Sequence, residues 1–203
     1  MKKLVIIGAS GHGKVAADIA RYTYNDILFL DDEPQESKCL GYPVVGAVDT
    51  YGDYLNEADF FVAIGSAAVR RDITEMLLAA GAALATLVHP RAVVADSVTL
   101  GQGTVVMAGA IVNPDSRIGK GCIVNTSASV DHDCRLADYV HVSVGAHLAG
   151  TVFVGNATWV GAGAIVKNNV DICGDCMIGA GAVVVRSITE SGTNTGVPAR
   201  RRS

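Results

Sequence analysis

Residues 94–124 read VADSVTLGQGTVVMAGAIVNPDSRIGKGCIV, with a valine, leucine or isoleucine at every sixth position. The same spacing continues without interruption as far as Val184. An α-helix repeats about every 3.6 residues and a flat strand every two, so neither produces a strict six-residue period. A coiled parallel sheet does, and three hexapeptides make one coil of about eighteen residues. The stretch therefore predicts a left-handed parallel β-helix, a three-sided prism of roughly five coils.

The position four residues after each aliphatic residue is small and often apolar, as expected of a narrow prism that holds one large and one small inward residue per strand. Cys122, Cys134 and Cys176 fall on this position, so three of the five cysteines are predicted to fill the core. Cys173 and Cys176 form a CxxC pair, but because Cys176 points inward we expect neither a metal site nor a redox centre there.

Composition limits the class of protein. The chain has 203 residues, half of them hydrophobic, which is enough for one or two domains. Its formal net charge is -4, so the sequence does not predict a positively charged surface for binding nucleic acid. The apolar run at residues 4–7 is too short for a signal peptide, and no stretch of about twenty apolar residues could span a membrane. We therefore expect a cytoplasmic protein without a nucleic-acid or membrane partner.

Residues 1–89 have a different pattern, in which buried strands alternate with helices. The apolar run at 4–7 ends in the glycine turn GASGHG, and a helix and a second apolar run follow. This βαβ unit predicts a Rossmann-like domain whose glycine turn opens a helix N-terminus suited to phosphate. The turn is not a Walker A loop, because Val15 replaces the Ser or Thr that would hold magnesium, and its glycine spacing is not GxGxxG. We predict two domains, 1–89 and 90–203, the second ending in a C-terminal tail.

The ligand edge of the first domain is expected where its strands end. Asp31 and Asp32 lie about twenty residues past the glycine turn, where an acidic residue commonly binds ribose or base, although they could simply cap a surface turn. A third strand ends at Gly65 on the same edge, and a helix over 67–80 is predicted to turn Arg70 toward water. A last strand is predicted over 84–88. This edge predicts a nucleotide as ligand.

His132 is the histidine best placed for chemistry. It lies between Asp131 and Asp133 at a predicted corner, where we expect an outward ring of raised basicity. Gly150 follows eighteen residues later, so its N–H is expected beside the ring on the next coil. A base and an oxyanion donor one coil apart suit acyl transfer. Neighbours along a strand point to opposite sides, so a His132–Asp133 bond requires the chain to bend there.

Seven segments together resemble the hexapeptide acyltransferases of bacterial sugar modification: GASGHG, FLDD, AIGS, NTSASVDHDC, HVSVGAHLAG, GAGAVVVRS and GVPAR. In particular, they resemble the PglD type, which N-acetylates a UDP-4-amino-4,6-dideoxy sugar and has the NeuD-like sialic acid O-acetyltransferases as relatives. The resemblance covers essentially the whole chain and both domains. It implies acetyl-CoA-dependent N-acetylation without a metal, in a homotrimer whose active sites lie between subunits.

The same resemblance implies roles for individual residues. His132 would be the general base, Asp133 would orient it, and Gly150 would donate its N–H to the thioester oxygen. The family often has Glu where this chain has Asp133, and it can have Gly where this chain has Ala180. The acetyl-CoA contacts that it implies are His141, Gly150, Ala162 and Ala180, and the UDP-sugar contacts are Ser10, Gly11, His12, Asp31, Asp32 and Gly65.

Two other functions stay open at this stage. The same fold could acetylate a hydroxyl, as on sialic acid, although the pair Asp31 and Asp32 favours a uridine nucleotide. Alternatively, the prism could serve only to hold three chains together, in a non-catalytic protein that senses a nucleotide sugar. Replacing His132 by alanine separates these classes, because an enzyme would lose turnover whereas a sensor would keep its ligand.

Overall fold

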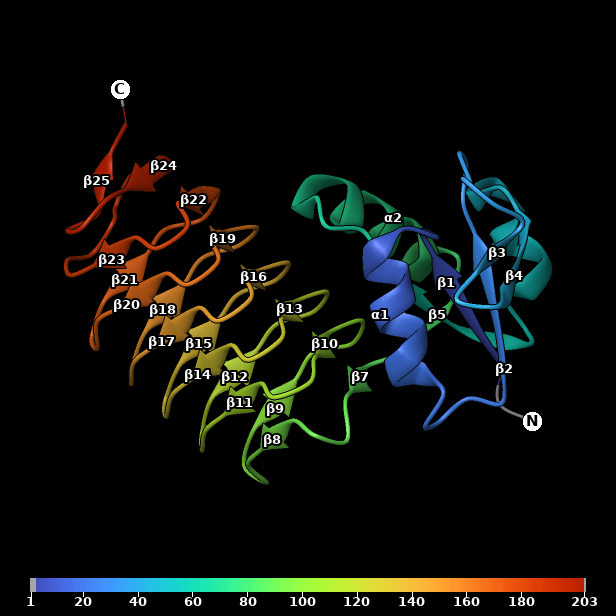
Figure 1. Cartoon of the computed structure of the whole chain (residues 1–203), viewed down its shortest axis with the longest axis horizontal. Coiled ribbons are helices and arrows are strands. Elements are labelled where there is room, and N and C mark those ends of the chain that lie inside the picture. The colour runs from blue at the N-terminus through green and yellow to red at the C-terminus, as the bar shows by residue number, and fades with distance from the viewer. Residues whose placement is uncertain (1–2, 203) are drawn as a thin grey trace. The chain divides into compact units, whose positions relative to one another are not determined.

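The computed structural model describes residues 3–202, which form two compact units that divide after Leu87 (Figure 1). The sequence placed this boundary at residue 89. Each unit has its own apolar core. Neither of the two α-helices within residues 3–202 has the length and apolar character needed to cross a membrane.

The first unit is the Rossmann-like sheet that the sequence predicted. Its strand order is β3-β4-β2-β1-β5-β6, and its pairs are parallel except for β3 with β4. The central strand β1 is buried because residues 4–7 are aliphatic throughout. The elements are β1 (Lys3–Ile7), α1 (Gly11–Ala20), β2 (Asp26–Leu30), β3 (Lys38–Cys39), β4 (Tyr42–Gly46), η1 (Val48–Tyr54), β5 (Ala58–Val62), α2 (Ala67–Ala79) and β6 (Ala83–Leu84).

Two expectations for this unit were wrong. The strand predicted over 84–88 is interrupted: β6 ends at Leu84, and Leu87–Val88 forms a separate strand, β7, at the end of a prism sheet. Arg70 does not face water but is only 1% exposed. Its guanidinium donates to the carbonyls of Ile64 and Gly65, both at 2.8 Å. These bonds satisfy backbone acceptors in the turn that leads into α2. The spacing of apolar residues along a helix does not show that a charged side chain is buried by hydrogen bonds to backbone carbonyls.

The second unit is the predicted left-handed parallel β-helix, and Figure 1 shows its coils stacked one on the next. Sixteen short strands, β8 to β23, follow the six-residue period, and the second residue of a two-residue strand is the inward aliphatic one. The sixteen strands are β8 (Val93–Val94), β9 (Thr99–Leu100), β10 (Val105–Val106), β11 (Ile111–Val112), β12 (Arg117–Ile118), β13 (Ile123–Val124), β14 (Ser129–Val130), β15 (Arg135–Leu136), β16 (His141–Val142), β17 (His147–Leu148), β18 (Phe153–Val154), β19 (Trp159–Val160), β20 (Ile165–Val166), β21 (Asp171–Ile172), β22 (Cys176–Ile178) and β23 (Val183–Val184). Two further strands, β24 (Gly192–Thr195) and β25 (Arg200–Arg201), follow them outside this period.

Three sheets form the sides of the prism. Their orders are β25-β24-β22-β19-β16-β13-β10-β7, β23-β20-β17-β14-β11-β8 and β21-β18-β15-β12-β9. From β8 to β23, strand residues pair with the residue eighteen positions later, as Ile123 does with His141 and His141 with Trp159. The constant register means that corner residues of successive coils also lie one above the next.

The core of the prism holds the aliphatic residues and the small residues that the sequence placed inside. Cys122, Cys134 and Cys176 are buried there as predicted, and they are free thiols. The few inward polar residues bond to the backbone near a corner. The Thr104 hydroxyl donates to the carbonyl of Gly119 at 2.7 Å and accepts from the N–H of Cys122 at 3.0 Å. Chemistry is therefore left to the corners and outer faces.

Candidate active site

His132 lies in the corner between β14 and β15, with its side chain 58% exposed. Its Nδ1 is 2.8 Å from Oδ2 of Asp133. The bend that this bond needs comes from Asp133 itself, whose φ of 58° is in the left-handed region that aspartate tolerates better than most residues. The structure thus brings together the two residues that the sequence paired as base and orienting carboxylate.

Three neighbouring residues hold this corner in place. Oδ1 of Asp131 accepts from the N–H of His132 and from the amide of Asn113, both at 2.8 Å. The Ser116 hydroxyl donates to the carbonyl of Asp131 at 2.6 Å and accepts from the N–H of Cys134 at 3.1 Å. The backbone on both sides of the histidine is therefore fixed by the preceding coil. Sequence reasoning missed Asn113 and Ser116, although Asn113 lies eighteen residues before Asp131 and Ser116 eighteen residues before Cys134.

The surroundings of His132 favour its protonated form. The hydrogen bond to Asp133, followed by the charges of Asp131 and Asp133, raises the pKa of His132 above its ordinary value, while desolvation opposes the shift. The pKa of Asp131 is lowered, chiefly by its hydrogen bond from Asn113. When Nδ1–H donates to Asp133, the lone pair of the neutral ring lies on Nε2. Nε2 is then the atom that can accept a proton.

Gly150 lies directly against this ring. A Cβ added at Gly150 would be 2.5 Å from both Cε1 and Nε2 of His132, so only glycine leaves room for the imidazole in this position. The Gly150 carbonyl accepts from the N–H of Asn169 at 3.1 Å, whereas its own N–H donates no hydrogen bond to any residue between 3 and 202. A proton acceptor and an amide donor thus occupy neighbouring positions of one corner.

His141 lies on a different side of the prism. It belongs to β16, is 8% exposed, and its Nε2 is 3.0 Å from the Asn125 amide. Its ring stacks on Trp159 of the next coil, with centroids 5.0 Å apart. Trp159 in turn donates from Nε1 to the Ser143 hydroxyl. Sequence reasoning missed Asn125 and Trp159, although adding eighteen to 141 leads directly to the tryptophan.

Ala162 and Ala180 lie on the corners that follow β19 and β22, and both are exposed. The coils that carry them are joined by the bond from the N–H of Gly181 to the carbonyl of Ala162, at 2.8 Å. This corner is not the one that carries His132 and Gly150. A single chain therefore does not bring all the predicted acetyl-CoA contacts to the same corner as the histidine.

The first unit has a cavity of about 300 Å³ at the ends of its parallel strands. Ser10, Asp31, Asp32 and Gly65 line it, whereas Gly11 is not among its lining residues. The Asp31 carboxylate already accepts from the N–H groups of Ala9, at 2.6 Å, and Glu33, at 2.9 Å. Asp32 gives one oxygen to the N–H of Val48 at 2.8 Å. Asp31 therefore shapes the glycine turn, and Asp32 keeps more of its carboxylate for a ligand.

His12 is also absent from the cavity lining. It lies in the first turn of α1, and its ring is edge-on to Phe61 with centroids 6.3 Å apart. Burial, followed by the positive charge of Arg70, lowers the pKa of His12 to about 4. Its Nε2 is buried and has no hydrogen-bond partner within residues 3–202. His12 is therefore a neutral ring at physiological pH.

The protein combines a β-helix of hexapeptide repeats with an outward histidine–carboxylate pair and an open glycine amide. This combination places it in the class of hexapeptide-repeat acyltransferases. Residues 3–77 match the family model of the PglD N-terminal domain. UDP-N-acetylbacillosamine N-acetyltransferase of Bacillus subtilis (strain 168) is 39% identical over 115 residues, 53% of this chain. That alignment spans 52% of the curated relative, about half of its length.

Two solved structures match over nearly their whole length. The acetyltransferase domain of PglB from Neisseria gonorrhoeae FA1090, in complex with acetyl coenzyme A, is 43% identical with a TM-score of 0.96 over 99% of each chain. PerB from Caulobacter crescentus, in complex with CoA and GDP-perosamine, is 40% identical with a TM-score of 0.93 over 100% of this chain and 98% of that one. The chain therefore belongs to the PglD-type family of amino-sugar N-acetyltransferases.

Proposed function

We propose that this protein transfers the acetyl group of acetyl-CoA to the 4-amino group of a UDP-linked 4-amino-4,6-dideoxy sugar. The observation that carries the proposal is the corner at which Nδ1 of His132 bonds Asp133 at 2.8 Å while the ring lies against Gly150. The names of the relatives support the class of acceptor: UDP-N-acetylbacillosamine N-acetyltransferase for one, and a complex with GDP-perosamine for another.

The proposed reaction is a direct transfer. Nε2 of His132 takes a proton from the sugar amine as its nitrogen attacks the thioester carbonyl, and the new C–N bond forms. The Gly150 N–H donates to the oxyanion of the tetrahedral intermediate. The C–S bond then breaks, and the CoA sulfur leaves with the proton that His132 accepted. Asp133 stabilises the imidazolium between these steps, and a positioned general base contributes about 10²- to 10⁴-fold.

The proposed acetyl-CoA contacts come from a second copy of the chain. His132 and Gly150 lie on one corner, whereas Ala162 and Ala180 lie on another. His141 belongs to the sheet whose strands lead into that second corner. The outward face of the sheet between the two corners exposes apolar side chains, with Val93 63%, Ile111 40% and Ile165 46% exposed. A homotrimer with inter-subunit sites would cover that face and bring the separated residues together. We place the reaction in the cytoplasm, where acetyl-CoA is supplied.

The nucleotide part of the acceptor is proposed to bind in the cavity of the first unit. Ser10, Asp32 and Gly65 line that cavity, and the free oxygen of Asp32 suits a ribose or base donor. Asp31 would support the site by fixing the glycine turn rather than by direct contact. Gly11 and His12 would act from beside the cavity, with His12 as a neutral packing group.

The test is to incubate the purified protein with acetyl-CoA and either a UDP-4-amino sugar, a UDP-2-amino sugar or sialic acid, and to follow thiol release. We expect acetylation of the 4-amino sugar, and a loss of about 10²- to 10⁴-fold in kcat for His132→Ala at unchanged Tm. His89→Ala is the matched control, because His89 lies in the first coil, before β8, and its Nδ1 accepts from the N–H of Arg91 at 2.9 Å. Faster reaction with sialic acid, or nucleotide-sugar binding without turnover in the wild type, would contradict the proposal.

A further inference from the structure

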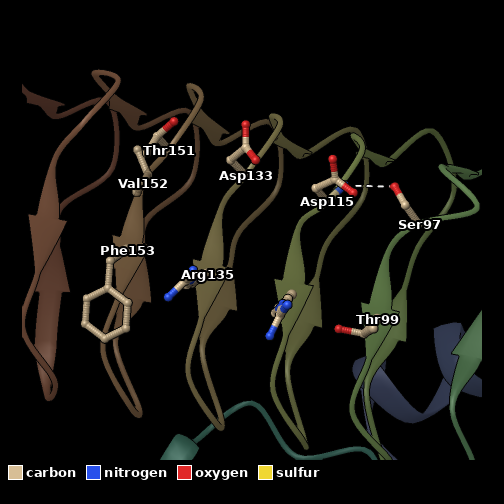
Figure 2. A pocket seen from close by; sticks show the side chains of 9 residues that line it. Ser97, Thr99, Asp115, Asp133, Arg135, Thr151, Val152 and Phe153 are labelled. Carbon is tan, nitrogen blue, oxygen red and sulfur yellow. Dashed lines mark hydrogen bonds between the residues drawn. The ribbon is translucent and has the colours of Figure 1, made fainter.

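Arg70 is the only lysine, arginine, aspartate or glutamate that is buried within residues 3–202. It lies in the first turn of α2 and is 1% exposed, although an arginine is almost never fully buried unless it is paired. Figure 2 shows the contrasting case of Arg135, whose side chain extends from β15 into an open groove of the prism. Water and salt screen an exposed charge of that kind, whereas a buried charge is screened much less. The proposed reaction, however, gives the buried cation no role.

The cavity of about 300 Å³ in the first unit has an acidic lining. It includes the carboxylates of Asp31, Asp32 and Glu33, and no lysine or arginine of the range 3–202 lines it. Lys14, which follows the glycine turn, is exposed and is not among the lining residues. The diphosphate of a nucleotide-linked sugar is anionic, so these carboxylates repel it, and the N–H groups of a helix N-terminus offer only a partial positive charge. A full positive charge behind the lining would offset the repulsion.

Arg70 lies directly behind this lining. Its Nη1 donates to the carbonyls of Ile64 and Gly65, both at 2.8 Å, and both of these residues line the cavity. Val69, the residue before Arg70, lines it as well. The guanidinium offsets the partial negative charge of the two carbonyl oxygens. It therefore brings a positive charge up to the cavity wall without entering the cavity.

The charge of Arg70 also reaches the glycine turn. In the first turn of α1, the pKa of His12 is lowered to about 4, chiefly by burial and then by the positive charge of Arg70. The glycine turn packs against the end of β5, since a Cβ added at Gly8 would be 3.0 Å from the carbonyl oxygen of Ala63 and 3.3 Å from Cγ1 of Ile64. The helix N-terminus that suits a phosphate thus lies within the field of the buried arginine.

We infer that Arg70 is a positioning residue for the nucleotide-linked sugar, because its buried charge draws the diphosphate into the acidic cavity through the wall formed by Ile64 and Gly65. This inference rests on the proposed function and adds a residue that does not line the cavity. Its burial matters for this role. An arginine inside the cavity would pair with the lining carboxylates, whereas Arg70 leaves Asp32 available to bind the ribose or base.

The experiment measures by calorimetry how UDP and uridine bind to the wild type and to Arg70→Gln, Arg70→Met and Arg70→Lys. Glutamine keeps a donor for the carbonyls, methionine fills the buried space with an unbranched chain, and lysine keeps the charge. Two unit charges about 10 Å apart, at an effective dielectric constant of about 20, change an equilibrium about 10- to 20-fold. Because a diphosphate carries more than one charge, we expect the Kd for UDP to rise about 10- to 100-fold in both neutral variants, while the Kd for uridine stays within about threefold.

Two further variants and readouts separate charge from packing. The lysine variant should keep the wild-type ratio of the two Kd values within about threefold. Arg71→Gln is the matched control and should match the wild type, because Arg71 is the next residue of α2, is exposed and bonds Asp72 at 3.4 Å. In steady state, the KM for the UDP-4-amino sugar should rise in the neutral variants by the same factor as the Kd for UDP, at a kcat within about twofold.

The pKa of His12 is an independent measurement, followed by NMR titration of its ring. It should rise from about 4 in Arg70→Gln, because one of the two causes that lower it has been removed, and it should stay low in Arg70→Lys. A histidine that is merely packed against a structural arginine would not distinguish glutamine from lysine in this way. An unmoved pKa in the glutamine variant would show that the charge does not reach the glycine turn, and it would overturn the inference.

Other outcomes also overturn the inference. Equal losses of UDP and uridine binding in the neutral variants would mean that Arg70 only maintains the turn, and unchanged UDP binding would mean that its charge is not used. If neither neutral variant shows a cooperative thermal transition, a lysine variant that loses the preference for UDP is sufficient to overturn it. A wild type that binds the nucleotide sugar but does not acetylate it would defeat the proposed function alone, whereas a wild type that binds neither UDP nor uridine would defeat both.

Discussion

Gly150→Ala is the substitution that most directly tests the corner. The added Cβ would be 2.5 Å from Cε1 and Nε2 of His132 and 3.1 Å from Cδ2, whereas carbon atoms in contact are normally about 3.5 to 4.0 Å apart. The imidazole must therefore move by about 1 Å or more. The Gly150 N–H, which is the proposed oxyanion donor, remains in the variant. The change thus displaces the base and leaves the amide in place.

The expected loss follows from that displacement. Nδ1 of His132 now lies 2.8 Å from Asp133, and a shift of about 1 Å takes the pair beyond hydrogen-bond distance. Misplacement of a catalytic group by about 1 Å can cost about 10²-fold in rate. The fold should tolerate the change, because the atoms that must move belong to a side chain that is 58% exposed. We expect kcat to fall about 100-fold while Tm changes by no more than a few degrees.

The assay is steady-state thiol release with a UDP-4-amino sugar, combined with thermal unfolding. Asn168→Ala is the matched control, since Asn168 is an exposed residue of the same corner on the next coil. The same substitution at Gly150 is then made in the His132→Ala background, where no ring remains to be displaced, and it should have little further effect. Full activity of Gly150→Ala would refute the reasoning, as would an equal loss in both backgrounds.

Two further predictions concern the proposed base and its partners. Because the pKa of His132 is raised and the neutral ring is the active form, kcat/KM should fall as the pH drops through that raised pKa. Asp133→Asn removes the main cause of the shift, so the acid limb of the pH–rate profile should move to lower pH and its plateau should decrease. A pH–rate profile in which the acid limb does not move would contradict this assignment. If sites form between copies, mixing His132→Ala with His141→Ala chains after dissociation and reassembly should restore part of the activity that each lacks alone, and no restoration would argue for sites within single chains.

The regular parts of the molecule could be predicted from the sequence because they obey a steric rule. A prism this narrow accepts one aliphatic and one small residue per side, so the six-residue period determines which side chains point inward and which residues lie one above the next. The alignment of Ile123, His141 and Trp159 follows from that rule, as does the contact between His132 and Gly150. The burial of three cysteines follows from it as well.

Other features depend on single polar contacts, which no period reveals. The His132–Asp133 bond requires a positive φ at Asp133, and the sequence could state this requirement but could not show that it is met. Arg70 appeared to be a surface residue because its helical position is one that charged residues often occupy. It is buried because two carbonyl groups of the preceding turn need a donor. Asp31 likewise satisfies backbone N–H groups.

The two carboxylates that flank His132 have separate tasks, and this separation explains how an exposed corner can hold a base in one orientation. Asp131 bonds the backbone N–H of His132, and together with Asn113 and Ser116 it fixes the chain. Asp133 bonds the ring alone and fixes the tautomer. Because a thioester is already an activated acyl donor, direct transfer requires little beyond a base and an amide donor. Both can be added at the corners of a prism without altering a single inward residue, so the packing rule that builds the fold leaves the chemistry free to vary.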